Sequence, residues 1–264
     1  MCTVSWLRRG DGYELLFNRD ERHTRKPALA PRMKELRGAR YIAPADGDFG
    51  GAWVGVNQFG LTLALLNRYD DSTLAPSGER VSRGLLLPGL LDSRSCAEVY
   101  SRFARLGLPR YQPFTLVALA PAEPLFLARW TGRECLMDAD AETAMPLSSS
   151  SFDTQGVVES RRRLFGQMAA RQGGVDADLL YAFHRSHEPA RGPYSVCMHR
   201  DDAATVSFSW IQVAGGSIRF IYHPASPCSF DPSRASALEM RLTNADATRV
   251  SHAEDWLTLS RRDR

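Results

Sequence analysis

The sequence predicts an α+β fold in which two mainly antiparallel β-sheets pack face to face and helices cover their outer faces. Strand-forming segments come in blocks of two or three, separated by pairs of helical segments, whereas a doubly wound parallel sheet needs strands and helices to alternate singly. The chain has 264 residues, of which 44% are hydrophobic, and can therefore bury a large core without disulfides or metals. We expect a single domain over residues 1–264.

The chain should begin with a β-hairpin. Residues 2–7 are β-prone, residues 9–12 (Arg-Gly-Asp-Gly) have turn chemistry, and residues 13–17 form a second strand-like segment. Because the turn reverses the chain, the residues just after Phe17 should finish close to Cys2. The segment from Arg25 to Phe49 is rich in proline and charge, and we expect a long loop there that closes a pocket over Cys2.

The remaining elements follow from apolar periodicity, which is two residues in strands and 3.6 in helices. A serine, Ser95, stands where it can cap a helix N-terminus. In chain order we expect a hairpin over 53–57 and 61–67, helices over 82–91 and 96–106, strands over 114–118, 125–130 and 134–137, helices over 157–171 and 177–185, and strands over 194–199, 205–213 and 217–223.

Composition argues against several function classes. The formal charge of +3 is small, and the arginine-rich stretches are interspersed with acids or lie on helix faces, so nucleic-acid binding is not indicated. No apolar run reaches the length of a membrane span or of a signal peptide, and the five cysteines form no disulfide pattern, so we expect a cytoplasmic protein without a membrane span. No phosphate loop, dinucleotide fingerprint or Gly-x-Ser-x-Gly elbow is present.

The most informative chemical feature is Cys2. If Met1 is removed, Cys2 carries both a thiol and a free α-amine, and that amine, with a pKa near 8, can accept the thiol proton around neutral pH. One residue then supplies a nucleophile and its base. The hairpin brings Asn18-Arg19-Asp20-Glu21 toward it, where Arg19 would stabilise a thiolate, lower the pKa of the thiol and make it react quickly with alkylating reagents.

Cys2 and two later runs of the sequence resemble the pattern of a known family. Met1-Cys2, the run Asn18 to Glu21, and the later run from Gly51 to Arg68 resemble the NRDE family, also called the transport-and-Golgi-organisation family. That family is similar to the N-terminal nucleophile hydrolases of the choloylglycine and penicillin V acylase type. The resemblance implies a four-layer αββα sandwich and cleavage of linear amide bonds by an N-terminal cysteine.

The resemblance also implies site residues. Cys2 matches the nucleophile, and Asn67, at the end of a strand, matches the asparagine that stabilises the oxyanion. Arg19 and Asp20 are assigned as the early Arg and Asp, although an ungapped match would place Asn18 and Glu21 there, so these two are kept as substrate-binding candidates. Ser149 occupies the place nearest to a second asparagine. The later arginine is assigned to Arg161, with Arg162 and Arg163 as neighbouring alternatives.

Two pairs of residues raise the question of a metal or haem. His184 and His187 lie three apart near a helix end, and Cys197 and His199 share one face of the strand expected there. The two histidines have no matching cysteine or histidine pair at zinc-finger spacing, and a helix C-terminus favours a charged histidine without a metal. A core cysteine beside a surface histidine is the common alternative for Cys197 and His199. We therefore expect no metal site and no cofactor.

Two functions remain open. The first is an N-terminal-cysteine amidohydrolase or acyltransferase that acts on a linear amide or acyl group of a small molecule. The alternative is a non-catalytic binding or trafficking protein on the same fold, for which haem or a lipid-like metabolite would be the ligand.

Overall fold

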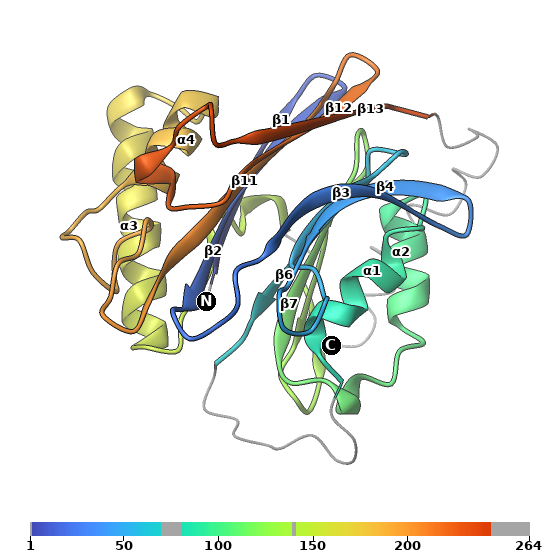
Figure 1. Cartoon of the computed structure of the whole chain (residues 1–264), viewed down its shortest axis with the longest axis horizontal. Helices are drawn as coiled ribbons and strands as arrows, with labels where there is room; N and C mark the ends of the chain where they lie inside the picture. Colours follow the sequence, from blue (N-terminus) through green and yellow to red (C-terminus); the bar gives the residue numbers. More distant parts are fainter. Residues whose placement is uncertain (1, 70–80, 139–140, 244–264) are drawn as a thin grey trace.

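Two antiparallel sheets pack face to face, with helices on both outer faces, in the computed structural model, which describes residues 2–69, 81–138 and 141–243 (Figure 1). The first sheet has the order β10-β1-β2-β11-β12-β13 and the second has the order β3-β4-β5-β6-β7-β8-β9. Helices α3 and α4 cover the first sheet, and α1 and α2 cover the second. The predicted α+β fold, a four-layer αββα sandwich, is confirmed.

The opening hairpin is present as predicted. Strand β1 (Cys2–Arg9) pairs with β2 (Gly12–Arg22) around a turn in which Gly10 has φ +51°, a conformation that favours glycine. The register sets Cys2 opposite Arg19. The short strand β10 (Leu147–Ser149), which the sequence patterns did not reveal, pairs on the other side of β1 and sets Ser149 opposite Cys2.

The rest of the first sheet follows β2. Strands β11 (Ala203–Ala214) and β12 (Ser217–His223) match the predicted pair, and β13 (Ser236–Arg241) is an additional edge strand. The predicted strand over 194–199 is wrong. At Ser195 and Cys197 the backbone forms hydrogen bonds with residues that are not part of a β-strand: Ser195 O accepts from the Arg161 side chain, and Cys197 N donates to Ser186 O.

The predicted long loop over 25–49 is also wrong, because strands β3 (Leu29–Leu36) and β4 (Ala39–Ala45) lie within it. Strand β3 is the edge of the second sheet. It contains Pro31 at a break in the register, and exposed charged residues follow it. Edge strands commonly carry proline, bulges and charge, and those features resemble a loop in the sequence.

The other strands of the second sheet are near their predicted positions. They are β5 (Val54–Asn57), β6 (Thr62–Asn67), β7 (Phe114–Leu119), β8 (Phe126–Trp130) and β9 (Cys135–Met137).

The helices begin at side-chain caps where they are long. Ser95 accepts from the Glu98 amide at the start of α2 (Cys96–Phe103), as predicted. Aspartates do the same for α3 (Thr154–Gln172) and α4 (Ala177–Arg185). Helix α1 (Leu86–Leu90) continues from a 3₁₀ turn at Arg83–Leu85. No helix in the described ranges is both long and apolar enough to cross a membrane.

Successive side chains of the hairpin point to opposite faces of the first sheet, and each face packs into a different hydrophobic core. Val4 and Trp6 belong to the core between the sheets, whereas Leu16 belongs to the core under α3 and α4. Cys2 lies at the edge of the core between the sheets. Strand β1 therefore starts within the first sheet with the Cys2 side chain facing the second sheet, near the label N in Figure 1.

Candidate active site

Cys2 is held by the strands on both sides of it. It is 7% exposed, and its backbone N–H donates to Ser149 Oγ at 3.0 Å. Opposite Cys2 on the other side stands Arg19, whose side chain shares its face of the sheet. The register of β1 with its two neighbours thus fixes the position of the sulfur before any ligand binds.

The Arg19 guanidinium is oriented by acids and an aromatic ring. It lies over the Trp53 ring at 4.3 Å, donates to Asp46 Oδ2 at 2.6 Å and contacts Glu21 Oε2 at 3.3 Å. Arg25 also donates to Asp46, at 2.7 Å. Burial alone would raise the pKa of Asp46, but the Phe49 amide and the two arginines hold it below its ordinary value.

Asp46 and Trp53 were not identified from the sequence. Asp46 stands in a turn with Gly47 and Asp48, where an aspartate is common for local reasons, and Trp53 resembled an ordinary core residue.

Asp20 points to the opposite face of the sheet from Arg19, because successive residues in a strand alternate. Its Oδ2 lies 3.5 Å from Arg161 Nη1, and its Oδ1 accepts from Thr205 Oγ1 at 2.6 Å. The same Arg161 nitrogen donates to Thr3 Oγ1 at 2.6 Å, and its other terminal nitrogen donates to Ser195 O at 2.7 Å. A buried ion pair therefore lies directly behind the strand end that carries Cys2.

The three consecutive arginines on α3 are now distinguished. Arg161 is 1% exposed, while Arg162 and Arg163 are exposed. Burial lowers the pKa of Arg161, and the charge of Asp20 opposes that change. Among the three, Arg161 is the side chain that reaches the back of the nucleophile strand.

The pKa of the Cys2 thiol runs opposite to the sequence-based expectation. Burial raises it to about 11 and the negative charge of Asp20 adds to this increase, although the chain's α-ammonium, Arg19 and the Asp20 backbone amide act to lower it. Desolvation outweighs these groups because the sulfur lies among core side chains. The thiol is therefore protonated at neutral pH unless a base takes its proton.

A cavity of about 760 Å³ lies beside this strand end. Asn67, at the end of β6, lines it together with Ser148 and Ser149 of β10 and residues of the first turns of α3. Asn67 Nδ2 donates to the Tyr69 hydroxyl at 3.0 Å. No residue of 25–49 lines this cavity; that segment approaches the Cys2 end of the strand through Asp46, which accepts from Arg19.

Asn18 lies away from this cavity. Its side chain faces α4, where Nδ2 donates to the backbone oxygens of His184 and Val196 at 2.9 and 3.0 Å. Its Oδ1 lies 2.9 Å from His184 Nδ1. Glu21, by contrast, lies on the Arg19 side of the sheet. The structure thus brings Cys2, Arg19, Glu21 and Ser149 to one strand end and leaves Asn18 in the helix-facing core.

His184 gives a pH-dependent prediction. Burial, with the charge of Arg161, lowers its pKa to about 3, and its Nε2 is 2.9 Å from Ser5 Oγ. Below about pH 6.5 the unfolded chain binds a proton that the folded chain excludes, so stability falls as pH falls from about 6.5 toward 3. Replacing His184 by glutamine should reduce the loss of unfolding free energy between pH 7 and 5 by about 2 kcal/mol, measured by urea unfolding. Equal losses in both proteins would contradict this account.

The sequence matches a known family, and the fold is similar to that of solved structures. The family model described as Transport and Golgi organisation 2 matches residues 1–189. No curated protein matches the sequence. Among solved structures, the C2A mutant of conjugated bile acid hydrolase from Clostridium perfringens is similar, with a TM-score of 0.55 and 13% identity, covering 91% of this chain and 92% of that one.

Two further solved structures share the fold. The N-acylethanolamine-hydrolyzing acid amidase ortholog of Caenorhabditis elegans has a TM-score of 0.53 and 13% identity, covering 80% of this chain and 92% of that one. Penicillin V acylase from Agrobacterium tumefaciens has a TM-score of 0.53 and 9% identity, covering 92% of this chain and 86% of that one. At such identities the likeness shows that the three structures share the fold of this chain.

Proposed function

The chain belongs to the Transport and Golgi organisation 2 family, and we propose that it is an N-terminal-cysteine amidohydrolase or acyltransferase acting on a linear amide or acyl group of a small molecule. One observation carries the proposal. Cys2 lies at a strand end between Arg19 and Ser149, with the buried Asp20–Arg161 pair directly behind it. The named activities of the three similar structures, hydrolysis of a conjugated bile acid, of an N-acylethanolamine and of penicillin V, support the same reaction class.

Activation of the thiol depends on the backbone nitrogen of Cys2. In a chain that starts at Cys2, this nitrogen is a free amine on the same residue as the sulfur, where it can accept the thiol proton despite the high thiol pKa. Ser149 Oγ already accepts from this nitrogen. We assign Ser149 a positioning role, because a hydroxyl that accepts from the ammonium fixes the direction of its remaining protons.

The charged groups around Cys2 have separate tasks. Arg19 shares the face of the sulfur, and its charge favours the thiolate. Asp20 and Arg161 lie on the other face, so they act on the strand rather than on the substrate. Their contacts tie Thr3 of the nucleophile strand to α3 and tie β2 to Thr205 of β11, and the Asp20 backbone amide faces the sulfur.

The substrate would occupy the cavity lined by Asn67 and Ser149, whose volume of about 760 Å³ is within the range typical of small-molecule sites. The Asn67 amide would leave Tyr69 and donate to the oxyanion that forms on the carbonyl oxygen. An oxyanion donor of this kind contributes about 10²–10³-fold in rate.

The proposed reaction has two halves. The Cys2 sulfur forms a bond to the carbonyl carbon while the α-amine takes the thiol proton. The tetrahedral intermediate then collapses, the C–N bond breaks, and the α-ammonium returns that proton to the leaving nitrogen. Water, or an amine acceptor in the transferase case, attacks the thioester in the same way and releases the acyl group.

One observation favours a carrier as the second candidate. The thiol pKa of about 11 is unlike that of a reactive cysteine, while the cavity next to it could hold a haem or a lipid-like metabolite without turnover. In that case the cavity would be the binding site, and Cys2 would be a core residue.

Turnover separates the two candidates. The chain beginning at Cys2 is incubated with acyl-amino acids and acyl-lactams, and the released amine and any acyl thioester on the N-terminal peptide are measured by mass spectrometry. Hydrolysis with a thioester at Cys2 supports the enzyme. Absence of turnover, with ligand binding that survives Cys2→Ser, supports the carrier.

A further inference from the structure

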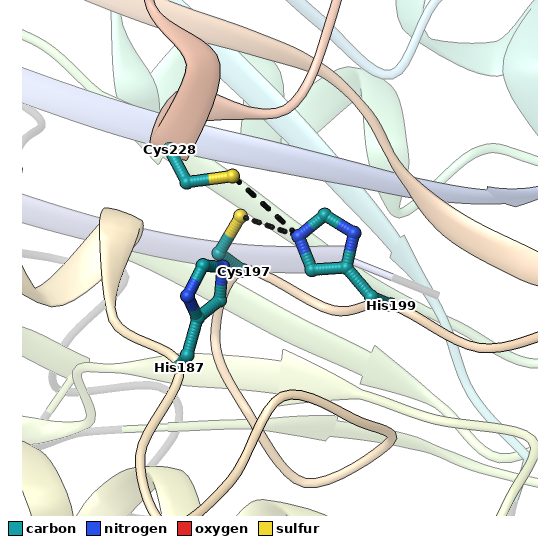
Figure 2. A group of neighbouring side chains, drawn as sticks. All are labelled: His187, Cys197, His199 and Cys228. Atoms are coloured by element: carbon teal, nitrogen blue, oxygen red, sulfur yellow. Dashed lines mark hydrogen bonds between the residues drawn. The ribbon is translucent and has the colours of Figure 1, made fainter.

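Four side chains with metal-binding atoms converge on one point outside the candidate active site. They are His187, Cys197, His199 and Cys228, and their ligand atoms all lie within 4.8 Å of one another (Figure 2). His199 Nε2 is 3.5 Å from the sulfur of Cys197 and 3.5 Å from the sulfur of Cys228. Within the described residues, no other group of three or more His, Cys, Asp or Glu side chains is arranged so that it could hold a metal ion.

The four ligands come from three separate segments. His187 follows the end of α4, Cys197 and His199 lie in the irregular segment before β11, and Cys228 belongs to a 3₁₀ turn at Pro227–Ser229 after β12. All five cysteines of the chain are free thiols in the structure. A single ion bound by these side chains would therefore join three parts of the chain that are not covalently linked.

The distances match a tetrahedral centre. Zinc lies about 2.3 Å from a cysteine sulfur and about 2.0–2.1 Å from a histidine nitrogen, so the S···N edge of a tetrahedron is roughly 3.5–3.6 Å. Both S···N distances to His199 are 3.5 Å. Two sulfurs and two imidazoles arranged in this way are the ligand set typical of Zn²⁺ in proteins.

His187 supplies an independent observation. Its Nε2 is buried and has no hydrogen-bond partner within the part of the chain that the structure describes, which is costly for a polar atom. Its ring packs edge-on against His199, with 5.1 Å between ring centres (Figure 2). An ion in the centre of the cluster would satisfy this nitrogen.

We propose that His187, Cys197, His199 and Cys228 hold one Zn²⁺ in a closed, structural four-ligand site. With four protein ligands the ion has no open position for a substrate. Burial raises the pKa of Cys197, so its thiol is protonated in the metal-free chain; on binding, the S–H bonds break and the protons pass to solvent.

The Arg191 side chain must adjust when the ion binds. It donates to His199 Nδ1 at 3.3 Å. With zinc on Nε2, the imidazole proton resides on Nδ1, and two donors would then face each other. Arg191 is exposed and can rotate into solvent.

The site has a structural consequence for the nucleophile strand. The segment that carries Cys197 and His199 also provides Ser195 O, which accepts from Arg161. The amide of Met198 donates to Thr205 Oγ1, and that hydroxyl donates to Asp20. Zinc would therefore fix the segment that holds the Asp20–Arg161 pair in place.

Zinc content and cobalt spectroscopy of the full chain test the proposal. Protein produced with added zinc under reducing conditions and then dialysed should retain about one Zn²⁺ per chain. Cobalt in its place should show thiolate-to-metal charge transfer and tetrahedral d–d bands. Cys228→Ser should weaken zinc binding by more than about 100-fold, because even the loss of a residue that supports a ligand costs 10–100-fold. Zinc should raise the Tm of the wild type, and this shift should disappear in the variant.

Cys135→Ser is the matched control, since Cys135 is also a partly buried cysteine but lies outside the cluster. It should bind zinc like the wild type. His187→Ala is the second variant and removes a ligand from a loop. Wild type without zinc, equal zinc in wild type and both ligand variants, or a Cys197–Cys228 disulfide under reducing conditions would overturn the proposal. If neither variant folds, the cobalt spectrum of the wild type decides.

Discussion

Replacing Cys2 by alanine should lower amide turnover by about 10⁴-fold or more. The nucleophile and its base act as a unit in a covalent mechanism, so the base cannot compensate for the loss of the nucleophile. Cys2→Ser keeps the size of the side chain but weakens the nucleophile, so it should lose nearly as much. Turnover is measured with the acyl-amino acid or acyl-lactam that the wild type hydrolyses fastest. Cys135→Ser, a cysteine in β9 away from the cavity, should retain wild-type turnover.

The Cys2 variants should remain folded. Cys2 lies at a strand end and at the edge of the core between the sheets, so loss of its sulfur should lower the free energy of unfolding by no more than about 1–2 kcal/mol. Loss of turnover would then not reflect unfolding. Undiminished hydrolysis by the alanine variant would refute the assignment of Cys2 as the nucleophile.

Replacing Arg161 by methionine should lower the free energy of unfolding by about 3–5 kcal/mol. The change removes the charged partner of a fully buried carboxylate, together with the hydrogen bonds that Arg161 donates to Thr3 Oγ1 and Ser195 O. The measurement is urea unfolding followed by tryptophan fluorescence.

The neighbouring arginine provides the control for this prediction. Arg163→Met lies two residues further along α3, is exposed, and should change stability by less than about 0.5 kcal/mol. Asp20→Asn combined with Arg161→Met removes both charges, so it should be less destabilising than the two single losses added together. Equal, small effects of Arg161→Met and Arg163→Met would show that the buried pair does not stabilise the strand end.

Local patterns were sufficient for the hairpin and the helices. Alternation and the Gly-Asp-Gly turn predicted β1 and β2, and with them the approach of Arg19 to Cys2. Ser95 predicted the start of α2, and the predicted range 177–185 coincides with α4. These features depend on neighbours along the chain, which the sequence displays directly.

Features that depend on distant partners were less predictable. Strand β3 resembled a loop because edge strands carry proline and charge, and 194–199 resembled a strand although its backbone bonds go to Arg161 and Ser186. The pKa of Cys2 was expected to fall because the sequence shows nearby charges but not burial. The sequence singled out His187, Cys197 and His199 in two separate pairs, but only the fold shows that they converge with Cys228.

The removal of Met1 tests the central claim most directly. Autonomous activation of the Cys2 thiol requires a free amine on Cys2, because that amine is the base of the proposed mechanism. Cys2 is a small residue, which permits cleavage by methionine aminopeptidase. The intact mass of the protein purified from cells should therefore be lower than that of the encoded sequence by one methionine residue, with a free cysteine at the N-terminus. A mass that shows retained or acetylated Met1 in an active protein would contradict the mechanism.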